Sequence, residues 1–161
     1  MGREIERKFL VTGDGWRGLA TAAARYEQFY LFAGADRSLR VRIADGRSAR
    51  LTLKTGRGLS RGEFEYDIPL DDAEALRETA LGAVVAKTRH FVPSGGHTIE
   101  VDVYEGALAG LVTAEIELED EAERFDRPDF LGREVTDEPA YLNQTLALAG
   151  LPVEAGEPEG R

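Results

Sequence analysis

Residues 3–11 read REIERKFLV, and polar and apolar side chains alternate along this stretch as they do in a β-strand. Glu4, Glu6 and Lys8 fall on one side of the predicted strand, and Ile5, Phe9 and Val11 fall on the other. Further strand-like patterns occur at residues 26–33, 37–44, 48–55, 62–70, 84–92, 97–105 and 111–119. The sequence therefore predicts eight strands.

Short turns separate these stretches and indicate how the strands are connected. Asp45-Gly46 and Ser94-Gly95-Gly96 are typical of antiparallel hairpins. The loop at 56–62 contains glycines and two arginines but matches no Walker motif, so it is predicted to be a mobile hairpin. Because long crossover connections are mostly absent, the expected sheet is antiparallel.

Three segments show apolar residues at helical spacing instead: residues 14–25, 71–81 and 140–149. Helices added to a large sheet give a mainly β, α+β fold. A chain of 161 residues suits one domain, which we expect over residues 1–153. The remaining tail at 154–161, EAGEPEGR, is predicted to be disordered.

Composition excludes several classes of partner and site. The 20 Lys and Arg residues are outnumbered by 30 Asp and Glu, and the net charge of −10 repels nucleic acid and anionic membranes. The chain has no cysteine, which excludes disulfides and thiolate-bound metal. The first residues are charged, and no stretch approaches the roughly 20 apolar residues of a membrane span. We therefore expect a cytoplasmic protein without membrane or nucleic-acid partners.

Charges of one sign recur on the same face of single strands. These pairs are Arg40 with Arg42, Glu63 with Glu65, Lys87 with Arg89, and Glu115 with Glu117. One polar face usually means a solvated sheet surface. A surface that serves solubility, however, tends to intersperse the two signs, because neighbouring like charges repel each other. The segregation of charge therefore indicates sites for ions.

Two arrangements satisfy the amphipathic pattern. An open sheet could carry helices on one face and water on the other, or a closed barrel could place apolar side chains outside under the helices and charges inside. A dry interior could not hold so many charges, because removing one ion from water costs several kcal/mol. Six Lys and Arg against eight carboxylates on these faces leave two excess negative charges, so we expect metal to bind before a polyanion does.

The opening Glu4-Ile5-Glu6-Arg7-Lys8 is similar to the ExExK signature of the CYTH superfamily, also called triphosphate tunnel metalloenzymes. Short charged motifs recur by chance, but six more follow in the family's order and extend the resemblance over nearly the whole chain. They are LRVRI at 39–43, LTLK at 51–54, GLSRGEFE at 58–65, AKTRH at 86–90, EVDVYEG at 100–106 and AEIELE at 114–119.

The resemblance implies a closed, eight-stranded antiparallel tunnel with a charged interior and about three helices packed outside. It also implies action on triphosphates with Mg²⁺ or Mn²⁺, and two ions are expected. The short stand-alone bacterial members, which this chain resembles, hydrolyse inorganic triphosphate to pyrophosphate and phosphate. Thiamine triphosphatase and class IV-type adenylate cyclase activities are alternatives on the same fold. A non-catalytic polyphosphate- or nucleotide-binding module is an alternative of another class, and a monomer or homodimer is expected.

The resemblance also assigns roles to the charged residues. Carboxylate oxygens suit Mg²⁺ and Mn²⁺, and guanidinium and ammonium groups suit phosphate oxygens. The expected metal ligands are Glu4, Glu6, Glu115 and Glu117, followed by Glu63, Glu65 and Asp102. The expected substrate contacts are Lys8, Arg40, Arg42, Lys54, Lys87, Arg89 and Tyr30, where Tyr30 is either a phosphate contact or an ordinary barrel aromatic. The expected catalytic residues are Lys8, Lys54, Glu63 and Lys87.

Overall fold

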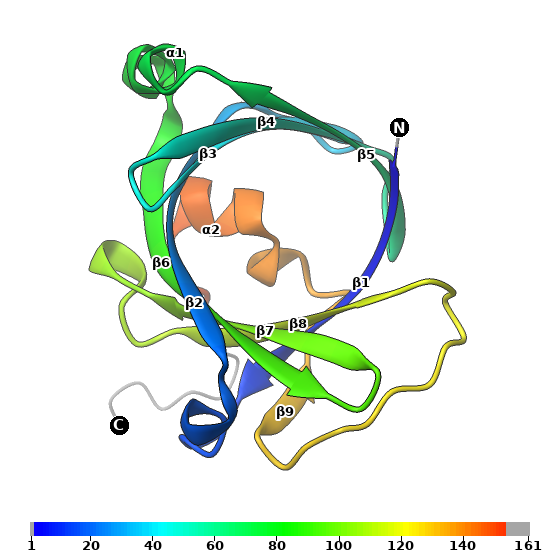
Figure 1. Ribbon diagram of the computed structural model, residues 1–161. Coiled ribbons are helices and arrows are strands. Elements are labelled where there is room, and N and C mark those ends of the chain that lie inside the picture. The colour runs from blue at the N-terminus through cyan, green and yellow to red at the C-terminus, as the bar shows by residue number, and fades with distance from the viewer. Residues whose placement is uncertain (1, 154–161) are drawn as a thin grey trace.

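The computed structural model describes residues 2–153, and in this part of the chain the strands close into an antiparallel barrel (Figure 1). The predicted tail at 154–161 lies outside the described residues. The strands are β1 (Gly2–Val11), β2 (Ala22–Ala33), β3 (Arg37–Ala44), β4 (Ser48–Thr55), β5 (Ser60–Ile68), β6 (Leu81–Ser94), β7 (His97–Tyr104), β8 (Val112–Leu118) and β9 (Leu131–Glu134).

The strand order is β5-β4-β3-β2-β6-β7-β8-β1-β9, and an additional pairing of β1 with β5 closes the first eight strands into a ring. This confirms the predicted eight-stranded antiparallel barrel and excludes the open sheet. The short strand β9 was not predicted, and it extends the sheet by pairing with the end of β1.

Strand register places the charged residues on the inner face. Lys8 lies opposite Glu115 on β8, and Arg89 lies opposite Asp102 on β7. Because side chains alternate across a strand, residues two positions away point the same way. The charges therefore face the interior of the ring.

Apolar side chains cover the outside of the ring. One cluster contains Phe9, Ile99, Val101 and Ile116, and Phe130 from the segment before β9 packs onto it. A second cluster lies where Ala73 of helix α1 (Leu70–Leu76) packs on β2, β3 and β4. The barrel is therefore inverted, with its hydrophobic cores outside and its charges inside.

The two α-helices of the described chain overlap the predicted segments 71–81 and 140–149, and α1 begins one residue before the first segment. In Figure 1, α1 lies outside the ring, whereas α2 (Asn143–Ala149) lies within its outline. Leu146 of α2 is buried against inward side chains of β2 and β6, so this helix covers one end of the barrel instead of its outer wall. No helix among residues 2–153 is long and apolar enough to span a membrane.

The helix predicted at 14–25 is wrong. The segment contains a 3₁₀ turn at Arg17–Leu19, and β2 already begins at Ala22, which pairs with Phe91 of β6. Trp16 is buried beside the outer cluster and lies 4.8 Å from the His90 ring, but Leu19 points to solvent. Sheet pairing with β6 thus overrides the helix propensity of the alanines at 20–24.

We expect Trp16→Ala to lower the free energy of unfolding by about 3–5 kcal/mol, because it removes a side chain that is 1% exposed from the outer core. Leu19→Ala is the matched control, since Leu19 is 55% exposed, and its effect should stay within about 0.5 kcal/mol. Urea denaturation followed by circular dichroism measures both. Equal losses in the two variants would contradict the observed packing of this segment.

Candidate functional site

The inward charges surround a cavity of about 130 Å³ inside the barrel. Seven different strands contribute to it, so the closed register brings together residues that are far apart in sequence. The lining residues are Glu4, Glu6, Arg40, Arg42, Lys54, Glu63, Glu65, Arg89, Glu100, Glu115, Glu117 and Asn143. Lys8 lines a smaller adjoining space together with Glu6 and Glu115. We call the larger space the inner cavity.

A buried ion cluster forms one part of the interior wall. The Lys87 ammonium donates a hydrogen bond of 2.7 Å to Asp102 Oδ2, and Arg89 donates to both Asp102 oxygens at 2.8 and 2.9 Å. Burial would raise the pKa of Asp102, but the charges of Arg89 and Lys87 hold it well below its ordinary value. Asp102 therefore fixes the two basic side chains in place, and both of its oxygens are already engaged.

Lys87 is 0% exposed, and burial lowers its pKa to about 7 even though Asp102 opposes that shift. Its ammonium also lies 5.3 Å from the centre of the Tyr104 ring. Lys87 can therefore exchange a proton near neutral pH while it stays anchored to Asp102.

The carboxylates of the inner cavity are unequally neutralised. Glu4 lies 2.7 Å from the Lys54 ammonium, and Glu115 accepts a hydrogen bond of 3.1 Å from Arg89. Glu6 has no hydrogen bond or ion pair within residues 2–153. Burial, together with the charges of Glu115 and Glu4, raises its pKa to about 8. Burial and the charge of Glu4 likewise raise the pKa of Glu63 to about 7.

This excess of carboxylates fits a divalent cation. A raised carboxylate pKa shows that the ionised form lacks compensation, and a bound cation would supply it. The oxygen donors also match the preference of Mg²⁺ and Mn²⁺. In the described part of the chain, no three acidic or histidine side chains are close enough to enclose a metal ion as they stand. Binding of a metal ion would therefore require the glutamates on the cavity wall, of which Glu6 is the least compensated, to reorient.

The arginines on β3 fit an oxyanion. Arg40 is buried, and its Nε has no hydrogen-bond partner in the described structure. An unpaired buried donor costs roughly 1–3 kcal/mol, and a phosphate oxygen is a suitable acceptor for it. Arg42 stacks on the Tyr26 ring at 4.2 Å and donates to Gln28, which holds its guanidinium against the same wall.

Tyr30 does not line the inner cavity. It packs with Val85, Tyr104 and Leu146 beneath α2, which favours the interpretation as an ordinary barrel aromatic. All the other predicted site residues line the inner cavity, adjoin it or belong to the buried ion cluster around Asp102.

The structure adds residues that the sequence-based site omitted. Tyr26 and Gln28 position Arg42, and their alternation with Tyr30 along one strand could have revealed them. Asn143 accepts a hydrogen bond of 3.3 Å from Lys8, whose ammonium also donates to the Tyr141 carbonyl at 2.5 Å. The signal for Asn143 was its polar side chain in the otherwise apolar segment AYLNQTLALA.

We expect Asp102→Asn to destabilise the protein by about 3–5 kcal/mol, because it leaves the buried Lys87 and Arg89 without their counter-charge. Asp67→Asn removes an exposed partner of Arg50 and should cost less than about 1 kcal/mol. Urea titration at pH 7 compares the two variants. Similar midpoints would mean that Asp102 does not hold the basic cluster.

Comparison with known proteins places this geometry in a family. An inorganic triphosphatase from Acetivibrio thermocellus is 44% identical over 147 residues, covering 91% of this chain and 94% of that protein. An inorganic triphosphatase from Nitrosomonas europaea is 39% identical over 153 residues, with coverage of 91% and 97%.

Solved structures agree with these sequence matches. The crystal structure of an inorganic triphosphatase superposes with a TM-score of 0.65 at 34% identity, covering 92% of this chain and all of that one. A Hippeastrum candidate adenylyl cyclase with a dominant triphosphatase activity matches at 0.59 over 73% of this chain and 80% of its own, and at 15% identity this match shows the fold alone. The model of the CYTH domain matches residues 2–146, and the chain therefore belongs to the CYTH domain family.

Proposed function

We propose that this protein hydrolyses inorganic triphosphate to pyrophosphate and phosphate in the inner cavity, with Mg²⁺ or Mn²⁺ as cofactor. The observation that carries the proposal is a single cavity inside the barrel that both arginines and uncompensated carboxylates line. A module that only bound anions would gain nothing from buried carboxylates, because they repel the ligand. The two curated relatives named as inorganic triphosphatases support the choice of substrate.

The basic residues would bind the phosphate chain. Arg40 offers its unpaired Nε, and Arg42 and Arg89 present guanidinium groups to the same cavity. Lys8 and Lys54 lie at its edge, where each is already paired with a carboxylate. Planar guanidinium groups can each contact two phosphate oxygens, so the arginines would orient the chain for in-line attack.

The acidic residues would hold the cofactor. Glu4, Glu6, Glu115 and Glu117 are the first candidates, with Glu63 and Glu65 next to them. A bound divalent cation would offset the phosphate charge and lower the pKa of a coordinated water. Asp102 has both oxygens committed to Lys87 and Arg89, so we assign it to positioning these side chains rather than to the metal.

Two groups are suited to accept the proton of the attacking water. Glu63 lines the cavity and has a pKa of about 7, and Lys87 has a pKa of about 7 beside the basic wall. A pKa near the working pH is what a general base needs. Several expectations stay predictions. They concern the choice between Mg²⁺ and Mn²⁺, the number of ions, the assembly as monomer or homodimer, the single domain over 1–153 and the cytoplasmic location.

The substrate test measures phosphate, pyrophosphate and cyclic AMP released from inorganic triphosphate, ATP and thiamine triphosphate, with Mg²⁺, Mn²⁺ or chelator. We expect the highest kcat/KM for inorganic triphosphate. We expect no hydrolysis of any of the three substrates when chelator is present. Preference for thiamine triphosphate or formation of cyclic AMP would select an alternative activity. Rates at the level of the protein-free control with every metal would favour the non-catalytic module.

We expect Glu6→Gln to lower metal-dependent kcat by on the order of a hundredfold or more, because Glu6 is the least compensated carboxylate. Thermal stability at pH 7 should not fall, since Glu6, whose pKa is raised to about 8, is already largely protonated at that pH and Gln is neutral too. Glu78→Gln, an exposed change outside the barrel, is the control for lost charge. Wild-type turnover in Glu6→Gln would contradict the ligand assignment.

The same residue predicts a pH dependence of metal binding. Glu6 and Glu63 hold protons below their raised pKa values of about 8 and 7, and a cation must displace those protons. The wild-type dissociation constant for Mg²⁺ should therefore fall as the pH rises from 6 to 8. Calorimetry in two buffers of different ionisation enthalpy should detect proton release, and Glu6→Gln should release less.

A further inference from the structure

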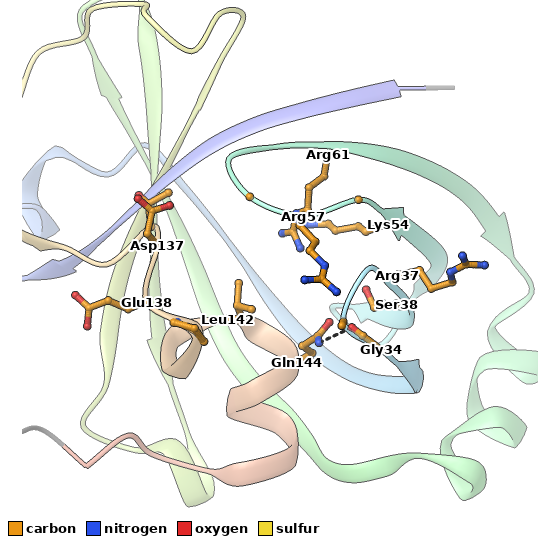
Figure 2. Close-up of a pocket in the computed structure, with 15 residues that line it drawn as sticks. Gly34, Arg37, Ser38, Lys54, Arg57, Arg61, Asp137, Glu138, Leu142 and Gln144 are labelled. Atoms are coloured by element: carbon orange, nitrogen blue, oxygen red, sulfur yellow. Dashed lines mark hydrogen bonds between the residues drawn. The ribbon is translucent and has the colours of Figure 1, made fainter.

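A second cavity of about 230 Å³ opens at the end of the barrel that α2 covers (Figure 2). Its walls come from the β2–β3 hairpin, the β4–β5 hairpin and the segment that leads into α2. The lining residues are Gly34, Ala35, Arg37, Ser38, Lys54, Gly56, Arg57, Gly58, Arg61, Thr136, Asp137, Glu138, Pro139, Leu142 and Gln144. We call it the outer cavity, and of its lining residues only Lys54 also lines the inner cavity.

The outer and inner cavities follow each other along the same strands. On β3, Arg37 and Ser38 line the outer cavity, and Arg40 lines the inner one. Lys54 borders both spaces, and its ammonium is paired with Glu4 of the inner cavity at 2.7 Å. An anion that moves between the two cavities therefore passes a lysine common to both.

The two cavities differ in the sign of their charge. Lys54, Arg57 and Arg61 line the outer cavity together with two acidic residues, so basic side chains outnumber acidic ones even without Arg37, which is paired with Asp36. The inner cavity has four basic residues, Arg40, Arg42, Lys54 and Arg89, against seven glutamates, and it stays negative without metal even when Glu6 is protonated. A free oxyanion therefore meets attraction first at the outer cavity.

Two of the three arginines of the outer cavity are available to a ligand, whereas Arg37 is paired with Asp36 at 3.5 Å. Neither Arg57 nor Arg61 has a hydrogen bond or ion pair with any residue that the structure describes, and Figure 2 shows both beside Lys54. Glu138, one of the two acidic residues, is bound to Arg133 instead. Gly56 and Gly58 adopt positive φ values of 91° and 83°, a conformation that suits glycine and lets the hairpin turn around Arg57.

The cavity is also held open by a fixed contact. The Gln144 side-chain amide of α2 donates a hydrogen bond of 3.0 Å to the Gly34 carbonyl, which ties the helix to the β2–β3 hairpin (Figure 2). The volume is smaller than that of typical sites for drug-sized molecules and suits a small inorganic ion. Arginine forks match the oxygens of such an ion.

We propose that the outer cavity is a binding site for phosphate-class oxyanions, at which inorganic phosphate or pyrophosphate is held between the inner cavity and solvent. The release of these products through it rests on the proposed function. Binding itself does not, because it needs neither metal nor turnover. Arg57 and Arg61 of the β4–β5 hairpin provide the guanidinium groups of the site, and Lys54 provides the side nearest the inner cavity.

The test is a titration of the full-length, metal-free protein with inorganic phosphate, and separately with pyrophosphate, at pH 7.5 and low salt. Amide resonances of Gly34, Gly56 and Gly58 report on the outer cavity, and those of Thr52 and Glu65 report on the inner wall. We expect saturable shifts at the three glycines with either anion. Shifts confined to the inner reporters, or no saturable shifts, would overturn the proposal.

The Arg57→Ala/Arg61→Ala variant should raise the dissociation constant of either anion by about tenfold or more, as expected for lost charge-assisted hydrogen bonds. Arg47→Ala is the control, because Arg47 is an exposed arginine in the β3–β4 turn at the opposite end of these strands. An unchanged constant in the double variant, or an equal rise in Arg47→Ala, would overturn the site. Absence of hydrolysis in the substrate test would refute the proposed function and leave this result standing.

Discussion

The pairing of β1 with β5 is the constraint on which the rest of the structure depends. Without this pairing, the charged faces of the strands could be exposed to bulk water, and the charged side chains would not need oppositely charged partners. With the ring closed, the same faces turn inward, and each buried ion must be compensated or neutralised. The apolar faces then turn outward, which is why α1, Trp16 and the segment before β9 pack on the outside of the barrel.

Compensation inside the ring is unequal, and this inequality sets the order of binding. Asp102 neutralises much of the charge on Lys87 and Arg89, whereas Glu6 is beside Glu4 and Glu115 without a cation of its own. A polyanion entering this space meets uncompensated carboxylates, so a cation has to bind before it or with it. The raised pKa values of Glu6 and Glu63 have the same cause, because a carboxylate that lacks a compensating positive charge binds a proton more readily.

Much of the barrel and of the inner cavity could be predicted because both depend on a period of two. Glu4, Glu6 and Lys8 share one face of β1 in any sheet. Closure of the barrel decides only whether that face is directed to the interior or to bulk solvent. The predicted helix at 14–25 failed because its outcome depends on pairing with β6, a contact 60 to 70 residues away that local spacing does not encode. The position of α2 and the contact of Asn143 with Lys8 could not be predicted for the same reason, because they too depend on contacts between residues that are distant in sequence.

The position of α2 gives the barrel two unlike ends. Leu146 seals part of one end against Tyr30 and Val85, and the opening beside it is lined by arginines from two hairpins. At the other end, Glu65 and Asp67 of β5 are exposed and pair with Arg50. A chain with a net charge of −10 repels anions over most of its surface. A local excess of unpaired arginine beside α2 therefore provides the favourable route for a small oxyanion, and the shared Lys54 continues that route into the inner cavity.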